Sequence, residues 1–203
     1  MTGTGGRRQV GHVSATAVGH ARAPLPVRRR AAMFFSLHSS WRMQLNASVY
    51  DLWVFRRGPQ GVEFLTLQSS QRKADRFFNG GTFWQVPSGV FRGGESVPQA
   101  VTREFLSYGL QARAIWAGEH AYTIYNRRFH EVQVITVFAV EVAAGAPQLN
   151  ADEHQAFAWL PFEAALARVH FRGLKDGLRS VQEYITGVEH PARELCLYDA
   201  STT

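Results

Sequence analysis

A glycine-rich loop and the charged segment after it carry the residues best suited to chemistry in this chain of 203 residues. Gly89 is followed after five residues by Glu95, and after seven more by the pair Arg103 and Glu104. Glycine lets a backbone approach a phosphate closely, and a helical carboxylate can share a Mg²⁺ ion with phosphate oxygens. Residues of these types are suited to chemistry that involves phosphate groups and a divalent cation.

The pattern resembles the signature motif of the Nudix family, G-x5-E-x7-R-E-U-x-E-E-x-G-U, in which U is a bulky aliphatic residue. Two flanking segments support the resemblance, namely WQVPSG at 84–89 and DEHQAFAWLP at 152–161. The resemblance covers about residues 43–185. Within the family, residues 83–85 and the stretch 153–160 most resemble dihydroneopterin triphosphate pyrophosphatases. The resemblance implies Mg²⁺- or Mn²⁺-dependent hydrolysis of a pyrophosphate bond.

The chain departs from that motif just after Glu104. Where the family has a pair of glutamates that bind metal, this chain has Ser107 and Tyr108, and Gly109 follows one residue early. A positioned acid or base contributes roughly 10²- to 10⁴-fold to a rate, so the loss should weaken catalysis by a comparable factor.

The resemblance assigns roles to the residues that remain. Glu104 becomes the helix ligand for a weakly bound Mg²⁺ or Mn²⁺, and Arg103 orients a glutamate. Glu153 matches a loop glutamate that binds metal in some relatives, so Glu104, Arg103 and Glu153 form the expected catalytic set. Glu95 and Gly89 are expected to stabilise the loop. For Glu153, ordinary turn composition is an equally good explanation.

Substrate contacts are expected from residues that precede the motif. Arg72, Lys73 and Arg76 lie where a phosphate-bearing substrate could meet them, although a solvated loop explains the cluster as well. Phe83 and Trp84 could stack on a base or pterin, but aromatic residues in a short strand are more often part of the core.

Hydrophobic periodicity and turn residues predict the elements that position these side chains. The helix at 96–106 has a capping box, Ser96 with Gln99, and Gly109 ends it. Strand 131–142 is apolar on both faces, which predicts a central place in the sheet. The other expected strands are 47–57, 63–68, 83–86, 112–125 and 155–160. Two further helices are expected at 162–169 and from Gly173 to about 185. A polar loop is expected at 69–81 and a glycine loop at 89–94.

This order of elements predicts an α+β fold. With the resemblance, it becomes a Nudix-type α/β/α sandwich with a mixed central sheet, the motif helix and a C-terminal helix. We expect the Nudix domain at 43–187 and a C-terminal tail at 188–203.

Charge and composition limit the classes of molecule that the folded part is expected to bind. The chain has 22 basic and 16 acidic residues, yet residues 1–42 hold seven arginines and no acid, and residues 43–203 hold 15 basic and 16 acidic residues. The basic character therefore belongs to the N-terminal segment and argues against a nucleic-acid partner for the folded part. The single cysteine predicts a cytoplasmic protein without disulfides, and no apolar run is long enough for a membrane span. A homodimer is left open.

Residues 1–42 have three interpretations. An Arg-rich, acid-poor segment suits an organellar transit peptide or an electrostatic arm. It could equally be translated from a wrongly chosen start, since Met33 and Met43 are available as later starts. We treat this segment as a basic, disordered or mis-annotated extension outside the fold.

Two functions follow as hypotheses. The first is a Mg²⁺-dependent hydrolase of a nucleoside diphosphate-linked substrate or a nucleoside or pterin triphosphate, weakened by the lost glutamate pair. The second is an inactive Nudix fold that binds a nucleotide for regulation. The retained Arg103 and Glu104 favour the first hypothesis, whereas Ser107 and Tyr108 favour the second.

Overall fold

The computed structural model describes residues 43–202, so the expected N-terminal extension lies outside the described residues. Eight strands form one sheet: β1 (Gln44–Gly58), β2 (Gly61–Ser69), β3 (Trp84–Gln85), β4 (Ser88–Val90), β5 (Ala112–Asn126), β6 (Glu131–Val142), β7 (His154–Leu160) and β8 (Cys196–Asp199). The helices are α1 (Gln71–Phe77), α2 (Val97–Tyr108), α3 (Phe162–Arg168) and α4 (Arg172–Val181), which continues as a π-helical turn over Gln182–Thr186; a 3₁₀ turn spans Arg193–Leu195. Among the described helices, none has the length and apolar character to cross a membrane.

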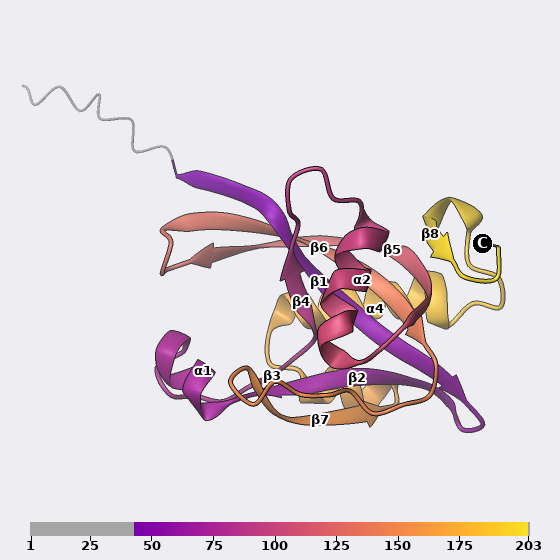
Figure 1. Cartoon of the computed structure of the whole chain (residues 1–203), viewed down its shortest axis with the longest axis horizontal. Helices are drawn as coiled ribbons and strands as arrows, with labels where there is room; N and C mark the ends of the chain where they lie inside the picture. The colour runs from indigo at the N-terminus through magenta and orange to yellow at the C-terminus, as the bar shows by residue number, and fades with distance from the viewer. Residues whose placement is uncertain (1–42, 203) are drawn as a thin grey trace, which may run out of the picture. The chain divides into compact units, whose positions relative to one another are not determined.

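The sheet is mixed, as the sequence predicts. Its main path runs β3-β2-β1-β6-β5-β8, while β4 pairs with β1 and β7 pairs with β2 (Figure 1). β1 and β6 run parallel, and the other pairs are antiparallel. β6 lies between β1 and β5, which confirms the central place predicted from its two apolar faces.

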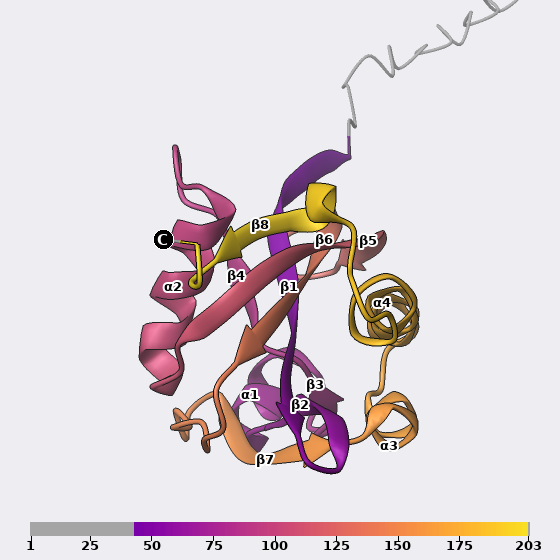
Figure 2. The same ribbon diagram turned by 90° about the vertical axis from the view of Figure 1, so that its right-hand side faces the viewer.

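Helices cover both faces of the sheet. Figure 2 shows α2 on one side and α3 and α4 on the other. Side chains of a strand alternate between faces, so Tyr50 and Leu52 of β1 join the core beneath α2. Trp53 and Phe55 join the core beneath α3 and α4. The structure confirms the α+β sandwich.

The helix that carries the motif is fixed at both ends. The Ser96 backbone N–H donates to Gln99 Oε1 at 2.9 Å, which completes the predicted capping box. At the other end Gly109 has φ 63°, a left-handed conformation that glycine adopts without strain. α2 therefore begins and ends where these residues place it, with Tyr108 as its last residue.

Three expectations about elements were wrong. The expected polar loop at 69–81 contains helix α1, whose N-cap Ser70 accepts the Lys73 N–H at 3.0 Å. The expected glycine loop begins with strand β4, which pairs with β1. The expected tail at 188–203 adds strand β8 to the edge of β5, so the fold extends beyond residue 187.

Candidate functional site

The loop between β4 and α2 is held by one carboxylate. Glu95 Oε1 accepts Arg103 Nε at 2.7 Å, and Glu95 Oε2 accepts Arg103 Nη2 at 2.8 Å and the Arg92 N–H at 3.0 Å. These hydrogen bonds, that of Arg103 first, lower the pKa of Glu95 to about 2. Arg103 Nη2 also donates to the Val90 carbonyl at 3.0 Å. The Glu95–Arg103 pair thus braces the loop against the helix.

Gly89 belongs to the same brace for a steric reason. A Cβ on Gly89 would lie 2.4 Å from the Tyr50 hydroxyl oxygen, far inside van der Waals contact. That hydroxyl donates to the Ala100 carbonyl of α2 at 3.3 Å. Gly89 therefore lets β4 pass over a tyrosine that ties β1 to α2.

Glu104 is the acidic residue that α2 retains at the site. Its side chain is 22% exposed, and Arg103 Nη1 lies 3.6 Å from its Oε2. Burial raises the pKa of Glu104, while the positive charges of Arg103, Arg92 and Lys73 act in the opposite direction. A half-buried carboxylate of this kind could accept a proton or join a cation site.

Ser107 and Tyr108, which stand in place of the glutamate pair, differ in exposure and in their contacts. Ser107 is exposed and its hydroxyl donates to the Glu104 carbonyl at 2.6 Å. Tyr108 is buried in the core beneath α2, with its ring centroid 6.1 Å from that of His154. Burial, followed by the charges of Glu104 and Glu153, raises the pKa of Tyr108. Tyr108 therefore packs as a core residue and stays protonated beside both carboxylates.

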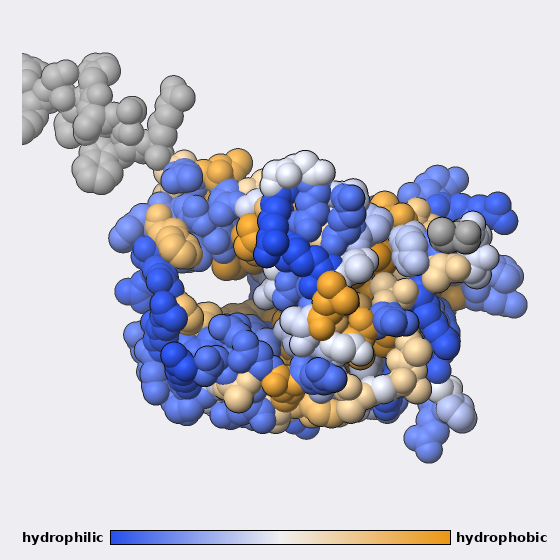
Figure 3. Space-filling model, viewed as in Figure 1, coloured by the Kyte–Doolittle hydropathy of each residue, from blue (hydrophilic) through white to orange (hydrophobic). Residues whose placement is uncertain are grey.

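Helix α1 brings a row of cations to the loop before β7. Lys73 Nζ lies 2.9 Å from Glu153 Oε2, and Arg72 Nη1 lies 2.5 Å from Asp152 Oδ1. A small cavity of about 90 Å³ lies at this junction, lined by Arg72, Lys73, Arg76, Phe77, Asp152 and Glu153. In Figure 3 the surface is hollowed between α1 and the hairpin of β5 and β6.

His154 supports the site from beneath. It is 5% exposed, and its Nε2 lies 3.0 Å from Gln85 Nε2. Burial and then the Lys73 charge lower its pKa to about 4, so the ring is neutral at physiological pH. Its Nδ1 is buried and has no hydrogen-bond partner within residues 43–202.

The two aromatic residues proposed as substrate contacts differ in exposure. Phe83 is buried between Phe78 and Phe171, with ring centroids 4.4 and 5.1 Å away. Trp84 is half-buried, and the Arg168 guanidinium carbon lies 4.7 Å above its ring. Trp84 is thus the more accessible of the two, although Arg168 covers one of its faces.

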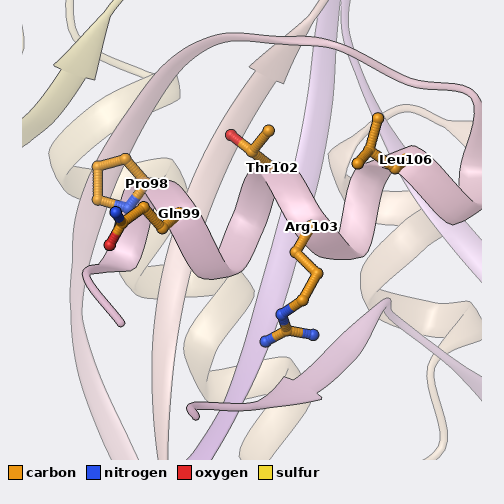
Figure 4. A pocket seen from close by; sticks show the side chains of 5 residues that line it. All are labelled: Pro98, Gln99, Thr102, Arg103 and Leu106. Atoms are coloured by element: carbon orange, nitrogen blue, oxygen red, sulfur yellow. The ribbon is translucent and has the colours of Figure 1, made fainter. Parts of the chain in front are cut away.

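A second, open depression of about 350 Å³ lies on the outer side of α2, lined by Pro98, Gln99, Thr102, Arg103 and Leu106. Figure 4 shows the Arg103 side chain leaving the helix on the side opposite Thr102 and Leu106. Arg103 is already paired with Glu95, so this face offers little chemistry of its own.

Sequence reasoning named Lys73 only as one of a basic cluster and overlooked its pairing with Glu153. A local signal for α1 existed, because Ser70 precedes a run of good helix formers and can cap it. No local signal places that helix against a loop so far along the chain.

The donors at the site fit a divalent metal poorly. The residues between 43 and 202 contain no group of three or more His, Cys, Asp or Glu side chains placed to hold an ion. Glu153 is paired with an ammonium, Ser107 turns its hydroxyl to a carbonyl and Tyr108 packs into the core. Of the two expected metal ligands, Glu153 forms an ion pair with Lys73 and Glu104 does not.

Comparisons with known proteins agree with this geometry. A family model described as the NUDIX domain matches residues 49–179. A curated octanoyltransferase from Myxococcus xanthus is 30% identical over 125 residues, which cover 61% of this chain and 33% of that protein. The chain therefore spans about a third of the length of this curated relative.

Solved structures share the fold at low identity. A Listeria monocytogenes protein described as a NUDIX hydrolase has a TM-score of 0.58 and 17% identity, covering 72% of this chain and 99% of its own. The NUDIX domain of Shewanella oneidensis NrtR, solved with ADP-ribose, has a TM-score of 0.54 and 18% identity, covering 71% of this chain and 89% of its own. With a family model that matches most of the chain around the Gly89–Glu95–Arg103–Glu104 motif, this protein belongs to the Nudix family.

Proposed function

We propose that this Nudix domain binds a phosphorylated, nucleotide-like small molecule, and that the pyrophosphohydrolase activity typical of its family is weak or lost. The observation that carries the proposal is the state of the helix positions after Glu104. Ser107 and Tyr108 stand where the motif has two glutamates, and Tyr108 is built into the core.

The ligand's phosphates would meet the basic side of the site. Arg72 and Arg76 line the cavity at α1 and are proposed to contact phosphate oxygens, for which a guanidinium is geometrically suited. The loop braced by Glu95 and Arg103 is proposed to present backbone N–H groups to the same ligand. Trp84 is proposed to contact a base or pterin ring, whereas the buried Phe83 would act by supporting it.

The second candidate is the hydrolase itself, dependent on Mg²⁺ or Mn²⁺ and acting on a nucleoside diphosphate-linked substrate or a nucleoside or pterin triphosphate. It is favoured by the intact contacts of Arg103 with Glu95 and Glu104 and by the partial burial of Glu104. In this candidate Glu104 and Glu153 hold the ion and Arg103 positions Glu104. Mg²⁺ is often bound by only one or two carboxylates together with substrate phosphates, but here Glu153 would first have to leave Lys73.

The single cysteine bears on the compartment in which the protein works. The one cysteine, Cys196, is not in a disulfide, which suits a reducing compartment. We therefore propose a cytoplasmic protein whose partner is a small molecule; a homodimer stays a prediction.

The test compares binding with turnover in the full-length protein. Calorimetry measures binding of ADP-ribose, nucleoside triphosphates, nucleotide sugars and dihydroneopterin triphosphate, and phosphate or pyrophosphate release is followed in parallel with Mg²⁺ or Mn²⁺. We expect at least one ligand to bind while release stays at the level of Glu104→Gln. Release well above that of Glu104→Gln would establish the hydrolase, and failure of every ligand to bind would overturn the proposed function.

A further inference from the structure

Lys73 is held in place more firmly than a surface lysine. Its side chain is 17% exposed, and its ammonium lies 2.9 Å from Glu153 Oε2. Two further hydrogen bonds tie the start of α1 to the same loop. The Ser70 N–H donates to the Glu153 carbonyl at 2.9 Å, and the Ser70 hydroxyl donates to the Asp152 carbonyl at 2.6 Å. The ion pair is therefore set by the backbone on both sides.

The neighbouring ion pair gives a comparison within the same structure. Arg72 and Asp152 are also close, but their side chains are 71% and 63% exposed. Exposed ion pairs of this kind contribute little to the stability of the fold, because water screens the charges and both side chains lose rotamer freedom. Lys73 and Arg72 are adjacent in sequence and each faces an acid, but only Lys73 is withdrawn from solvent.

The Lys73 charge acts on more than Glu153. It lowers the pKa of Glu104 against the effect of burial, and it lowers the pKa of His154. Tyr108, in turn, feels the charges of both Glu104 and Glu153. The ammonium therefore contacts Glu153 and its charge also acts on Glu104, the two carboxylates that the family resemblance names as metal ligands.

We propose that the Lys73 ammonium takes the place of the divalent cation at this site. It neutralises Glu153 in the unliganded protein, and it donates to a phosphate oxygen when a ligand binds, so binding requires no divalent metal. This inference rests on the proposed function, since it specifies how that site balances the charge of a bound phosphate.

The chemistry of an ammonium suits this exchange. It has three N–H donors, and Glu153 accepts one of them in the structure. The adjoining cavity of about 90 Å³ has the volume of roughly three liquid waters, enough for one phosphate group. Arg72 and Arg76 line the same cavity and add positive charge. A phosphate seated there would contact lysine and arginine donors, as anions commonly do in proteins.

The first experiment needs no nucleotide. Binding of Mn²⁺ to the full-length protein is measured by electron paramagnetic resonance for the wild type, Lys73→Met and Arg72→Met. Removing Lys73 frees Glu153 and removes a repelling charge, so Lys73→Met should bind Mn²⁺ at least about tenfold more tightly than the wild type. Arg72→Met removes one positive charge from the exposed pair, which water screens, so it should raise the Mn²⁺ affinity clearly less than Lys73→Met does.

Two results would overturn the proposal. One is tight Mn²⁺ binding by the wild type, and the other is equal Mn²⁺ binding by Lys73→Met and Arg72→Met. Melting curves establish that both variants are folded. Lys73→Gln, which keeps a polar group toward Glu153, replaces Lys73→Met if the latter does not fold.

The second experiment measures ADP-ribose binding with EDTA and with Mg²⁺. We expect equal wild-type affinity in both, and for Lys73→Met a loss of about tenfold or more in EDTA that Mg²⁺ partly restores. Wild-type binding that requires Mg²⁺ would overturn the role of Lys73 and leave the proposed function standing. If no ligand of the panel binds but Lys73→Met still gains Mn²⁺ affinity, the proposed function fails while the charge substitution is supported.

Discussion

The buried carboxyl of Asp51 should make this protein lose stability as the pH rises from about 4 to about 6. Asp51 lies in β1 and is 6% exposed, and its Oδ2 accepts a hydrogen bond from the Tyr122 hydroxyl of β5. Burial raises the pKa of Asp51 from 3.8 to about 6, and the hydrogen bond from Tyr122 only partly opposes that rise. The folded protein therefore retains a proton that the unfolded chain has already released.

The magnitude follows from the pKa difference. Between the two pKa values the unfolded state binds fewer protons than the folded state, so the free energy of unfolding falls as the pH rises. Each pKa unit corresponds to about 1.4 kcal/mol, which gives a loss of about 3 kcal/mol across the window. Above about pH 6 the carboxyl is ionised in both states, so its contribution no longer changes.

The assay is urea unfolding of the wild type and Asp51→Asn at several pH values, followed by tryptophan fluorescence. Asparagine can still accept from Tyr122 but does not titrate, so Asp51→Asn should gain about 3 kcal/mol relative to the wild type between pH 4 and pH 7. Tyr122→Phe should raise the pKa of Asp51 and move the window to higher pH. A difference between wild type and Asp51→Asn that stays constant with pH would refute the reasoning.

Three further predictions concern the motif and the sheet edge. Gly89→Ala should displace the Tyr50 hydroxyl and destabilise the protein by ~1–3 kcal/mol, measured by urea unfolding, whereas an unchanged unfolding midpoint would mean that β4 adjusts freely. Ser107→Glu should change the free energy of unfolding by less than about 0.5 kcal/mol because the position is exposed. Tyr108→Glu should lower it by ~3–5 kcal/mol because a core ring is lost. Equal melting temperatures of the two variants would contradict the assignment of Tyr108 to the core. Deleting residues 196–203 removes β8 and uncovers the edge of β5, so we expect a lower melting temperature and aggregation on light scattering, neither of which a dispensable tail would produce.

Local sequence rules predicted the elements that carry their own signals. Helix α2 was predicted because Ser96 and Gln99 form its N-terminal box and Gly109 ends it in a left-handed conformation. Strand β6 was predicted as central because both of its faces are apolar. In each case the residues that determine the structure lie inside the element or next to it.

Among the overlooked elements, β4 and β8 depend on partners elsewhere in the chain, whereas α1 has a local capping signal at Ser70 but little hydrophobic pattern. α1 has seven residues and buries only Ala74, so it shows no amphipathic period. β4 has three residues and β8 has four, and each is a strand because it pairs with a longer one, β1 or β5. Short segments like these carry too little hydrophobic pattern to be recognised alone.

Some contacts of the candidate site could be predicted from the sequence, and others depend on the fold. The Glu95–Arg103 brace agrees with what the resemblance implies, since it gives Arg103 the role of orienting a glutamate and Glu95 that of stabilising the loop. The pairing of Lys73 with Glu153 depends on the fold that brings α1 against the loop before β7, and the sequence offered only two separate charged stretches. Likewise, the substitution by Tyr108 is visible in the sequence, but its packing against His154 is not.

The burial of Tyr108 also bears on attempts to build the family's glutamate pair into this chain. A glutamate introduced at residue 108 would place a carboxylate in a tightly packed interior, and the folded population would fall. An acidic helix face therefore requires compensating changes around His154 as well as exchanges on α2.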